Sequence, residues 1–179
     1  SSTYTLNSTF GSGVVIKGTG ILMNNEMDDF SAAPGIPNQF GLLGAKANEI
    51  EPQKRPLSSM TPTIIMKDGE LFFTTGSPGG SRIISAVLQS ILNIIDFEMN
   101  LEEATFAKRI HHQWQPDVLE IEFSIENEAK AELENMGYSI EIKEPLTCIQ
   151  TIMFSNNKYY GYGDFRRPDA LASGKINDR

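Results

Sequence analysis

Residues 63–82 read TIIMKDGELFFTTGSPGGSR, and this stretch decides the fold. Asp68-Gly69 separates two apolar runs, which is the sequence pattern of a tight hairpin turn, so residues 63–66 and 71–75 are predicted to pair as antiparallel strands. Both arms are almost continuously apolar, which predicts strands that are buried on both faces. The glycine-rich residues 76–82 then lead directly from the second strand into a helix.

The elements downstream of the hairpin mix helices and strands. The helix is predicted from about Ser81 to Phe97, because polar residues recur every three or four positions and leave a wide apolar face. Asn100 and Glu103 have the spacing of a reciprocal cap and predict a second, short helix. Strands are expected at residues 118–123, 139–143, 148–154 and 159–162, and a helix at 126–136 that ends at Gly137. This mixture indicates an α+β protein.

The part upstream of the hairpin is less regular. Short strands with glycine between them are expected at residues 4–10, 13–17 and 20–24. Residues 26–62 contain five prolines and have neither helical nor strand periodicity, and long loops of this kind inside a compact chain are usually functional. We expect residues 1–179 to form a single domain in which residues 31–62 are a long lid or substrate loop.

Composition excludes several classes of function. The chain has 179 residues, of which 40% are hydrophobic, and its formal net charge of −8 argues against binding a phosphate backbone. Cys148 is the only cysteine, so an internal disulfide is impossible, and no cysteine or histidine lies near it at metal-ligand spacing. No run of about 18 apolar residues is present, so no membrane span is expected.

The strongest local signal for chemistry is the turn from Thr74 to Arg82. Unpaired backbone N–H groups converge where a strand turns into a helix, and the helix dipole favours negative charge there. Gly79 and Gly80 would allow close backbone approach, so this turn is a candidate oxyanion pocket for acyl transfer. The alternative is a tight strand-to-helix connection with no ligand.

Two further segments carry candidate binding groups. Residues 24–30 place three carboxylates within four positions, which suits an ammonium group or a hard cation, although a solvated acidic turn is equally compatible with the pattern. The glycine that a calcium loop needs at its sixth position is missing. Ser58 and Ser59 lie between two prolines, where both hydroxyls could donate to one carboxylate, or the segment could be a plain loop. His111 and His112 are interpreted as hydrogen-bonding residues without a catalytic role.

Several motifs together resemble a known family. Residues 4–11 (YTLNSTFG), 22–30 (LMNNEMDDF), Asn48 followed by 54–60 (KRPLSSM), and 76–82 (GSPGGSR) occur in this order and at this spacing in the small subunit of γ-glutamyltranspeptidase, also called glutathione hydrolase. The resemblance implies an N-terminal-nucleophile hydrolase fold, a four-layer αββα sandwich shared between two chains that are cut from one precursor.

The resemblance also implies roles for individual residues. In this family a threonine attacks the γ-glutamyl amide, its own α-amine acts as base, and water, an amino acid or a peptide resolves the acyl-enzyme. Thr5 is similar to a threonine that orients the nucleophile, and Gly79 and Gly80 to the oxyanion-hole pair. The resemblance assigns the substrate α-ammonium to Asn7, Glu26 and Asp29, and the substrate α-carboxylate to Ser58 and Ser59.

Some expectations concern what lies outside this sequence. The family's nucleophilic threonine precedes the matched Tyr-Thr-Leu-Asn strand, so this chain by itself is expected to be inactive. A large subunit from the same precursor is expected to supply an arginine for the carboxylate. No metal and no organic cofactor is implied, and the family works in the periplasm or outside the cell. The segment from Pro34 to Gly44 matches the family's lid loop and carries Phe40 where many members have tyrosine.

Three different functions remain compatible with the sequence. The same fold could act as a poly-γ-glutamate depolymerase, for which the adjacent cations Arg166 and Arg167 would suit a polyanionic substrate. It could also act as a cephalosporin acylase. The third is that of a homologue that binds γ-glutamyl compounds or amino acids without catalysis.

Overall fold

The computed structural model describes residues 5–123 and 125–174. Three α-helices, two short 3-10 helices and seven strands lie in these ranges. The helices are η1 (Glu26–Asp29), η2 (Lys46–Asn48), α1 (Arg82–Ile95), α2 (Leu101–Phe106) and α3 (Asn127–Asn135), and the strands are β1 (Thr63–Lys67), β2 (Glu70–Gly76), β3 (Ile110–His111), β4 (Leu119–Glu122), β5 (Ile140–Lys143), β6 (Gln150–Ser155) and β7 (Lys158–Gly163).

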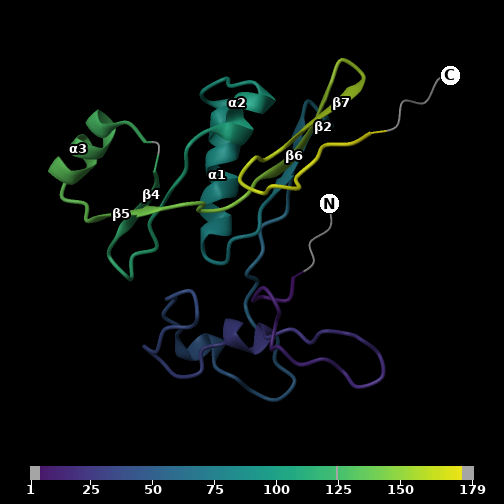
Figure 1. Cartoon of the computed structure of the whole chain (residues 1–179), viewed down its shortest axis with the longest axis vertical. Coiled ribbons are helices and arrows are strands. Elements are labelled where there is room, and N and C mark those ends of the chain that lie inside the picture. The colour runs from purple at the N-terminus through teal and green to yellow at the C-terminus, as the bar shows by residue number, and fades with distance from the viewer. Residues whose placement is uncertain (1–4, 124, 175–179) are drawn as a thin grey trace.

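The predicted hairpin is confirmed and forms half of the main sheet. β1 pairs with β2 through a turn at Asp68-Gly69, and β2 pairs antiparallel with β6, so that the strand order is β1-β2-β6-β7. Helices α1 and α2 cover one face of this sheet (Figure 1). Phe73 is fully buried on that face against Ile94 and Leu101.

The prediction that both faces of the hairpin are buried is wrong for the described chain. Ile64 is 56% exposed and Ile152 is 50% exposed. Both side chains lie on the face opposite α1 and α2, because each pairs with Thr74 across the sheet, one residue away from the buried Phe73 position. Among the described residues, the segment from Ala170 to Ala172 lies beside Gly161 and Gly163 of β7 on this face, but no helix or sheet covers it.

A second, smaller unit lies on the other side of α1. Strands β3, β4 and β5 form a three-stranded sheet in which β3–β4 is antiparallel and β4–β5 is parallel, and α3 connects β4 to β5 (Figure 1). The predicted reciprocal cap of α2 is confirmed, because Asn100 Oδ1 accepts from the Glu103 N–H and Glu103 Oε2 accepts from the Asn100 N–H. The four downstream strands and the helix ending at Gly137 are confirmed within two residues at each end.

A buried ion network joins this unit to the main sheet. Arg109 Nη2 lies 3.0 Å from Asp164 Oδ2, and Arg166 bridges Asp164 Oδ1 at 3.1 Å and Glu122 Oε2 at 2.6 Å. Asp164 also accepts the Ile149 N–H at the start of β6. The four side chains are nearly inaccessible to solvent, so the network fixes how the two sheets meet around α2.

Residues 5–60, which include η1 and η2, lie at one end of the molecule, away from the α-helices and the strands (Figure 1). The strands predicted over residues 5–10, 13–17 and 20–24 are not formed; only an isolated bridge between Val15 and Leu22 is present, and Tyr4 lies outside the described residues. Four glycines from Gly11 to Gly20 have positive φ and turn the chain repeatedly, and no described strand lies beside these residues to pair with them. Residues 26–62 are aperiodic as predicted, apart from η1, η2 and isolated bridges.

None of the described helices has the length and apolar character needed to cross a bilayer.

Candidate active site

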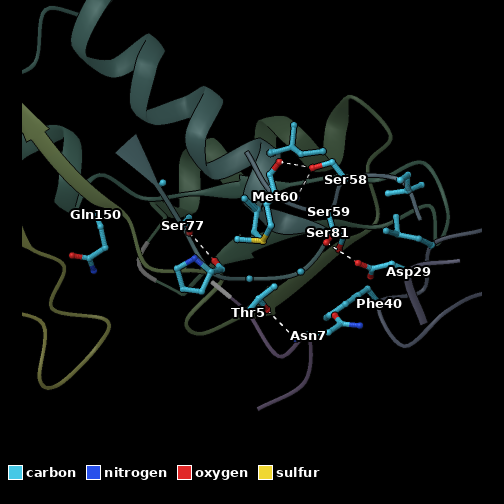
Figure 2. A pocket seen from close by; sticks show the side chains of 18 of the residues that line it. Thr5, Asn7, Asp29, Phe40, Ser58, Ser59, Met60, Ser77, Ser81 and Gln150 are labelled. Carbon is cyan, nitrogen blue, oxygen red and sulfur yellow. Dashed lines mark hydrogen bonds between the residues drawn. The ribbon is translucent and has the colours of Figure 1, made fainter. Parts of the chain in front are cut away.

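A large cleft lies between the N-terminal segment and the end of the main sheet. Its volume is about 1490 Å³, and its walls come from residues in the first third of the chain, the β2–α1 connection and the β6–β7 hairpin. Figure 2 shows side chains from these segments turned toward a shared space. Seven of the eight predicted site residues line the cleft, namely Thr5, Asn7, Asp29, Ser58, Ser59, Gly79 and Gly80.

The acidic segment and the serine segment meet in this cleft. Ser59 Oγ donates a hydrogen bond of 2.7 Å to Asp29 Oδ2, although the two residues are far apart in sequence (Figure 2). Asn48 fixes the two segments relative to each other, because its Nδ2 donates to the Asp29 carbonyl at 2.7 Å and its Oδ1 accepts the Leu57 N–H at 3.1 Å. Ser58 is exposed, and its Oγ donates to the Met60 carbonyl at 3.2 Å. The Ser59 hydroxyl is thus held beside the Asp29 carboxylate, whereas the Ser58 hydroxyl contacts the backbone of Met60.

Glu26 lies next to Asp29 but is not part of the cleft wall. Its burial, together with a hydrogen bond to Asp29 and the charge of that residue, raises the pKa of Glu26 from its usual 4.5 to about 7. Glu26 Oε1 is buried and has no hydrogen-bond partner among the described residues. A buried carboxylate oxygen without a partner is costly, so Glu26 Oε1 has an unmet need for a hydrogen-bond donor.

The glycine turn forms the second wall of the site. Gly79 has φ +138° and Gly80 has φ +59°, conformations that favour glycine, and α1 begins two residues after Gly80. Neither the Gly79 nor the Gly80 N–H donates a hydrogen bond within the described part of the chain. Two free N–H groups beside a helix N-terminus are suited to bind an oxyanion.

Neighbouring side chains enclose the turn on both sides. A Cβ added to Gly80 would lie 2.4 Å from the Phe40 ring, and one added to Gly79 would lie 3.0 Å from Thr147 Oγ1. Beneath the turn, the buried Ser77 hydroxyl contacts Thr147 Oγ1 and donates to the Cys148 carbonyl at 3.0 Å. The turn therefore has no room for larger residues.

Thr5 and Asn7 enter the cleft from the N-terminal segment. The Asn7 N–H donates to Thr5 Oγ1 at 2.9 Å, and Asn7 Nδ2 donates to the Asn25 carbonyl at 3.3 Å. Asn25 in turn accepts the Ser8 N–H on its Oδ1. These contacts attach Asn7 to the acidic segment, on the same side of the cleft as Asp29 (Figure 2).

Other candidates have structural roles. No group of three or more His, Cys, Asp or Glu side chains that could hold a metal occurs in residues 5–123 and 125–174, so the acidic segment does not form such a site. Both histidines make hydrogen bonds, as predicted: His111 hydrogen-bonds Ser85 and Gln113, and His112 hydrogen-bonds Asp117.

The prediction that Arg166 and Arg167 act as a pair of cations is wrong. Arg166 is used in the buried ion network, because its guanidinium bridges Glu122 and Asp164. Only Arg167 lines the cleft. The pair therefore does not present two adjacent cations to a polyanionic substrate.

Several residues that organise the site have no functional signal in the sequence. Asn48 is recognisable only as part of a motif, and Thr147 has no local pattern around it that indicates its contact with the glycine turn. Gln113 is equally inconspicuous, although its amide donates to the Phe40 carbonyl at 3.0 Å. The partners of these side chains are distant in sequence, so no local pattern identifies them.

Comparisons with known proteins show the family to which the chain belongs. The gamma-glutamyltranspeptidase family model matches residues 1–174, and the chain belongs to this family. It is 51% identical over 173 residues to the glutathione hydrolase proenzyme of Escherichia coli strain K12, an alignment that covers 96% of this chain and 30% of the relative. The chain thus spans about a third or less of the length of the curated relatives it matches.

Solved structures confirm the predicted fold. The T380A mutant of Helicobacter pylori gamma-glutamyltranspeptidase has a TM-score of 0.89 and 49% identity, covering 93% of this chain and 92% of that chain. The Pseudomonas nitroreducens enzyme complexed with L-DON has a TM-score of 0.90 and 42% identity, covering 99% and 92%. The fold is that of the N-terminal-nucleophile hydrolases.

More distant structures share only the fold. Cephalosporin acylase from Bacillus halodurans has a TM-score of 0.79 at 24% identity, covering 93% of this chain and 30% of that chain. An acylase is therefore less similar to this chain than the gamma-glutamyltranspeptidases are.

Proposed function

We propose that this chain is the small-subunit part of an enzyme that hydrolyses or transfers γ-glutamyl groups from glutathione and other γ-glutamyl amides. The single observation that carries the proposal is the Ser59–Asp29 hydrogen bond of 2.7 Å in the same cleft as the free Gly79 and Gly80 N–H groups. The head of a glutamate carries an ammonium and a carboxylate, and its γ-carbonyl develops negative charge during acyl transfer. The cleft thus contains a carboxylate for the ammonium, hydroxyls for the carboxylate and N–H groups for the developing oxyanion.

The two charges at the glutamyl head are assigned to the acidic and serine segments. Asp29, Glu26 and Asn7 receive the α-ammonium, and the unpaired Glu26 Oε1 supports this assignment because it needs a cationic or donor partner. The hydroxyls of Ser58 and Ser59 receive the α-carboxylate. Substrate binding then requires Ser59 to redirect its hydroxyl proton from Asp29 toward the incoming carboxylate, while the ammonium replaces it on Asp29.

The chemical step is acyl transfer at the γ-carbonyl. A nucleophilic threonine, which we place upstream of this chain on the basis of the resemblance, attacks the carbon of the γ-carbonyl group and gives its hydroxyl proton to its own α-amine. The Gly79 and Gly80 N–H groups stabilise the resulting oxyanion, and Thr5 orients the attacking hydroxyl. The C–N bond breaks, and the amine leaves with the proton. Water or the amine of an amino acid then attacks the γ-glutamyl ester, and one of its protons passes to the threonine oxygen as the ester C–O bond breaks.

A second chain is part of the proposal. The sheet face that carries the exposed Ile64 and Ile152 is covered by no helix or sheet among the described residues, which favours a large subunit from the same precursor packed against it. This subunit supplies an arginine for the substrate carboxylate. We place the enzyme in the periplasm or outside the cell, as the family resemblance implies, and fractionation of the source cells tests this location.

The proposal is tested by comparing the complete enzyme with the 179-residue chain. The complete enzyme is expected to release aniline from a γ-glutamyl anilide, whereas the purified chain alone is expected to release none. Calorimetry measures whether the complete protein binds glutamate, and comparison with its turnover separates a catalytic from a non-catalytic homologue. Glutamate binding by a complete protein that turns over no γ-glutamyl amide would instead support a non-catalytic binding homologue. Preferential cleavage of poly-γ-glutamate would support a depolymerase, and preferential cleavage of a cephalosporin would support an acylase.

A further inference from the structure

Gln113 connects the core of the molecule to the loop that covers the glycine turn. It follows β3 in sequence, and its Nε2 donates to the Phe40 carbonyl at 3.0 Å and to the Gln115 carbonyl at 3.1 Å. Phe40 lies 73 residues earlier in the chain, so this is a long-range tie between two loops. The contact is close, because a Cβ added to Gly41 would lie 3.3 Å from Gln113 Nε2.

Neighbouring hydrogen bonds fix the orientation of the Gln113 amide. Because Nε2 faces two carbonyl oxygens, it must be the NH₂ group, and Oε1 is left as an acceptor. His111 Nε2 lies 2.9 Å from that Oε1, so His111 donates from Nε2. His111 Nδ1 lies 2.7 Å from Ser85 Oγ on α1, and in the neutral imidazole it accepts the hydroxyl proton. A directed chain of hydrogen bonds thus runs from α1 through His111 and Gln113 to the Phe40 carbonyl.

The loop that receives this bond is a closed unit. Asn38 organises the turn over residues 38–42: its Oδ1 accepts the N–H groups of Phe40 and Leu42, and its backbone carbonyl accepts the N–H of Gly41. The turn is also tied to the acidic segment, because the Gln39 N–H donates to Asp28 Oδ2 at 3.1 Å. These bonds hold residues 38–42 together as one unit. The bond from Gln113 to the Phe40 carbonyl therefore sets the position of the Phe40 ring.

The Phe40 ring lies directly against Gly80, one of the two residues with a free N–H at the cleft. We propose that Gln113 is a positioning residue that fastens residues 38–42 over the Gly79-Gly80 turn and thereby limits the access of water to its N–H groups. The tie itself stands on geometry alone. Its consequence for turnover rests on the proposed function. If the Gly79 and Gly80 N–H groups bind the oxyanion, excluding water from them lowers the rate of hydrolysis relative to the rate of transfer to an acceptor amine.

The tie is tested in the complete enzyme by limited proteolysis. Chymotrypsin cleaves after phenylalanine, and it needs the Phe40 ring and the following peptide bond to be released from Gly80 and Gln113. Gln113→Glu keeps the shape of the side chain but places a carboxylate oxygen against two carbonyls, so we expect cleavage between Phe40 and Gly41 to become about tenfold faster. Gln113→Met removes the donor without adding charge and is expected to raise the rate about threefold.

Gln115→Glu is the matched control, since it makes the same chemical change two residues away on an exposed side chain, and its cleavage rate should stay within twofold of the wild type. If both Gln113 variants fold and are cleaved at the wild-type rate, the tie is refuted. This result does not depend on any γ-glutamyl activity.

The positioning role has its own readout. With a γ-glutamyl donor and an amino acid acceptor, Gln113→Glu is expected to lower the ratio of transfer to hydrolysis about threefold, whereas Gln115→Glu leaves the ratio unchanged. Faster cleavage with an unchanged ratio would overturn the role in positioning. Absence of turnover in the wild type would contradict the proposed function and leave the proteolysis result to decide the tie.

Discussion

Asp164→Asn is expected to destabilise the protein strongly. Asp164 is fully buried, and its two carboxylate oxygens accept hydrogen bonds from Arg109, from Arg166 and from the Ile149 N–H. Asparagine has nearly the same shape but carries no charge, and its amide NH₂ would face a guanidinium or a backbone N–H. The substitution therefore changes the electrostatics of the network and leaves its packing almost intact.

The magnitude follows from the charge count of the network. Arg109 and Arg166 balance Asp164 and Glu122 in a region that is almost closed to solvent. Burial already lowers the pKa of Arg109, which shows that its cation is poorly solvated there. Loss of the Asp164 charge leaves one cation uncompensated, and removing one partner of a buried ion pair costs about 3 to 5 kcal/mol.

Urea denaturation of the complete enzyme, followed by circular dichroism, measures this loss. Asp117→Asn is the matched control, because Asp117 is 83% exposed where it pairs with His112, and the free energy of unfolding should change by less than about 0.5 kcal/mol. Adding Arg109→Gln to the Asp164→Asn variant restores the charge balance, so the double variant should lose less than the sum of the single losses. A loss below about 1 kcal/mol for Asp164→Asn would show that the network does not hold the two sheets together.

Three further predictions concern the cleft. Because the pKa of Glu26 is raised to about 7, its carboxyl stabilises the fold most below pH 4.5, and this contribution is lost as the pH rises through 7. The ionised carboxylate instead favours an ammonium ligand, so calorimetry should show tighter glutamate binding at about pH 8 than at about pH 6. Glu26→Gln should make glutamate binding less dependent on pH. Asp29→Asn and Ser59→Ala should each weaken glutamate binding by about 1 to 3 kcal/mol, and unchanged dissociation constants would remove these residues from the site. Gly80→Ala should lower the free energy of unfolding by about 1 to 3 kcal/mol, since its Cβ would collide with Phe40 at a left-handed φ. Gly174→Ala should have little effect, because no atom of the described residues lies within 4 Å of its Cβ.

The sequence predicts the elements whose cause is local. The hairpin follows from Asp68-Gly69 between two apolar runs, and α2 follows from the Asn100–Glu103 cap, because neighbours in sequence supply the contacts that form them. The strands expected upstream of residue 25 fail for the complementary reason. An alternating pattern forms a strand only beside another strand, and no described strand is available to residues 5–24.

In the candidate site, too, the features with local causes are predictable from the sequence, and those that depend on distant residues are not. Its chemical types are predictable, because carboxylates, hydroxyls and a glycine turn each occupy short segments whose composition indicates what they can bind. Their convergence in one cleft, with Ser59 on Asp29, requires either the family resemblance or the structure. Local sequence contains no information on which of two distant loops will meet, so Asn48 and Gln113 could not be found from their own neighbourhoods.

Arg166 and Arg167 show that a charged residue in a sequence does not reveal what its side chain contacts in the structure. The two side chains are adjacent and chemically identical, yet Arg166 is buried between Glu122 and Asp164, while Arg167 lines the cleft. The difference arises because successive residues point in different directions, and only one direction leads to buried carboxylates. A cation beside such carboxylates is already neutralised and has little attraction left for a substrate. Of the two, Arg167 is therefore the residue to substitute if an anionic acceptor or donor is found to bind, and Arg166 the one whose loss should affect folding before it affects binding.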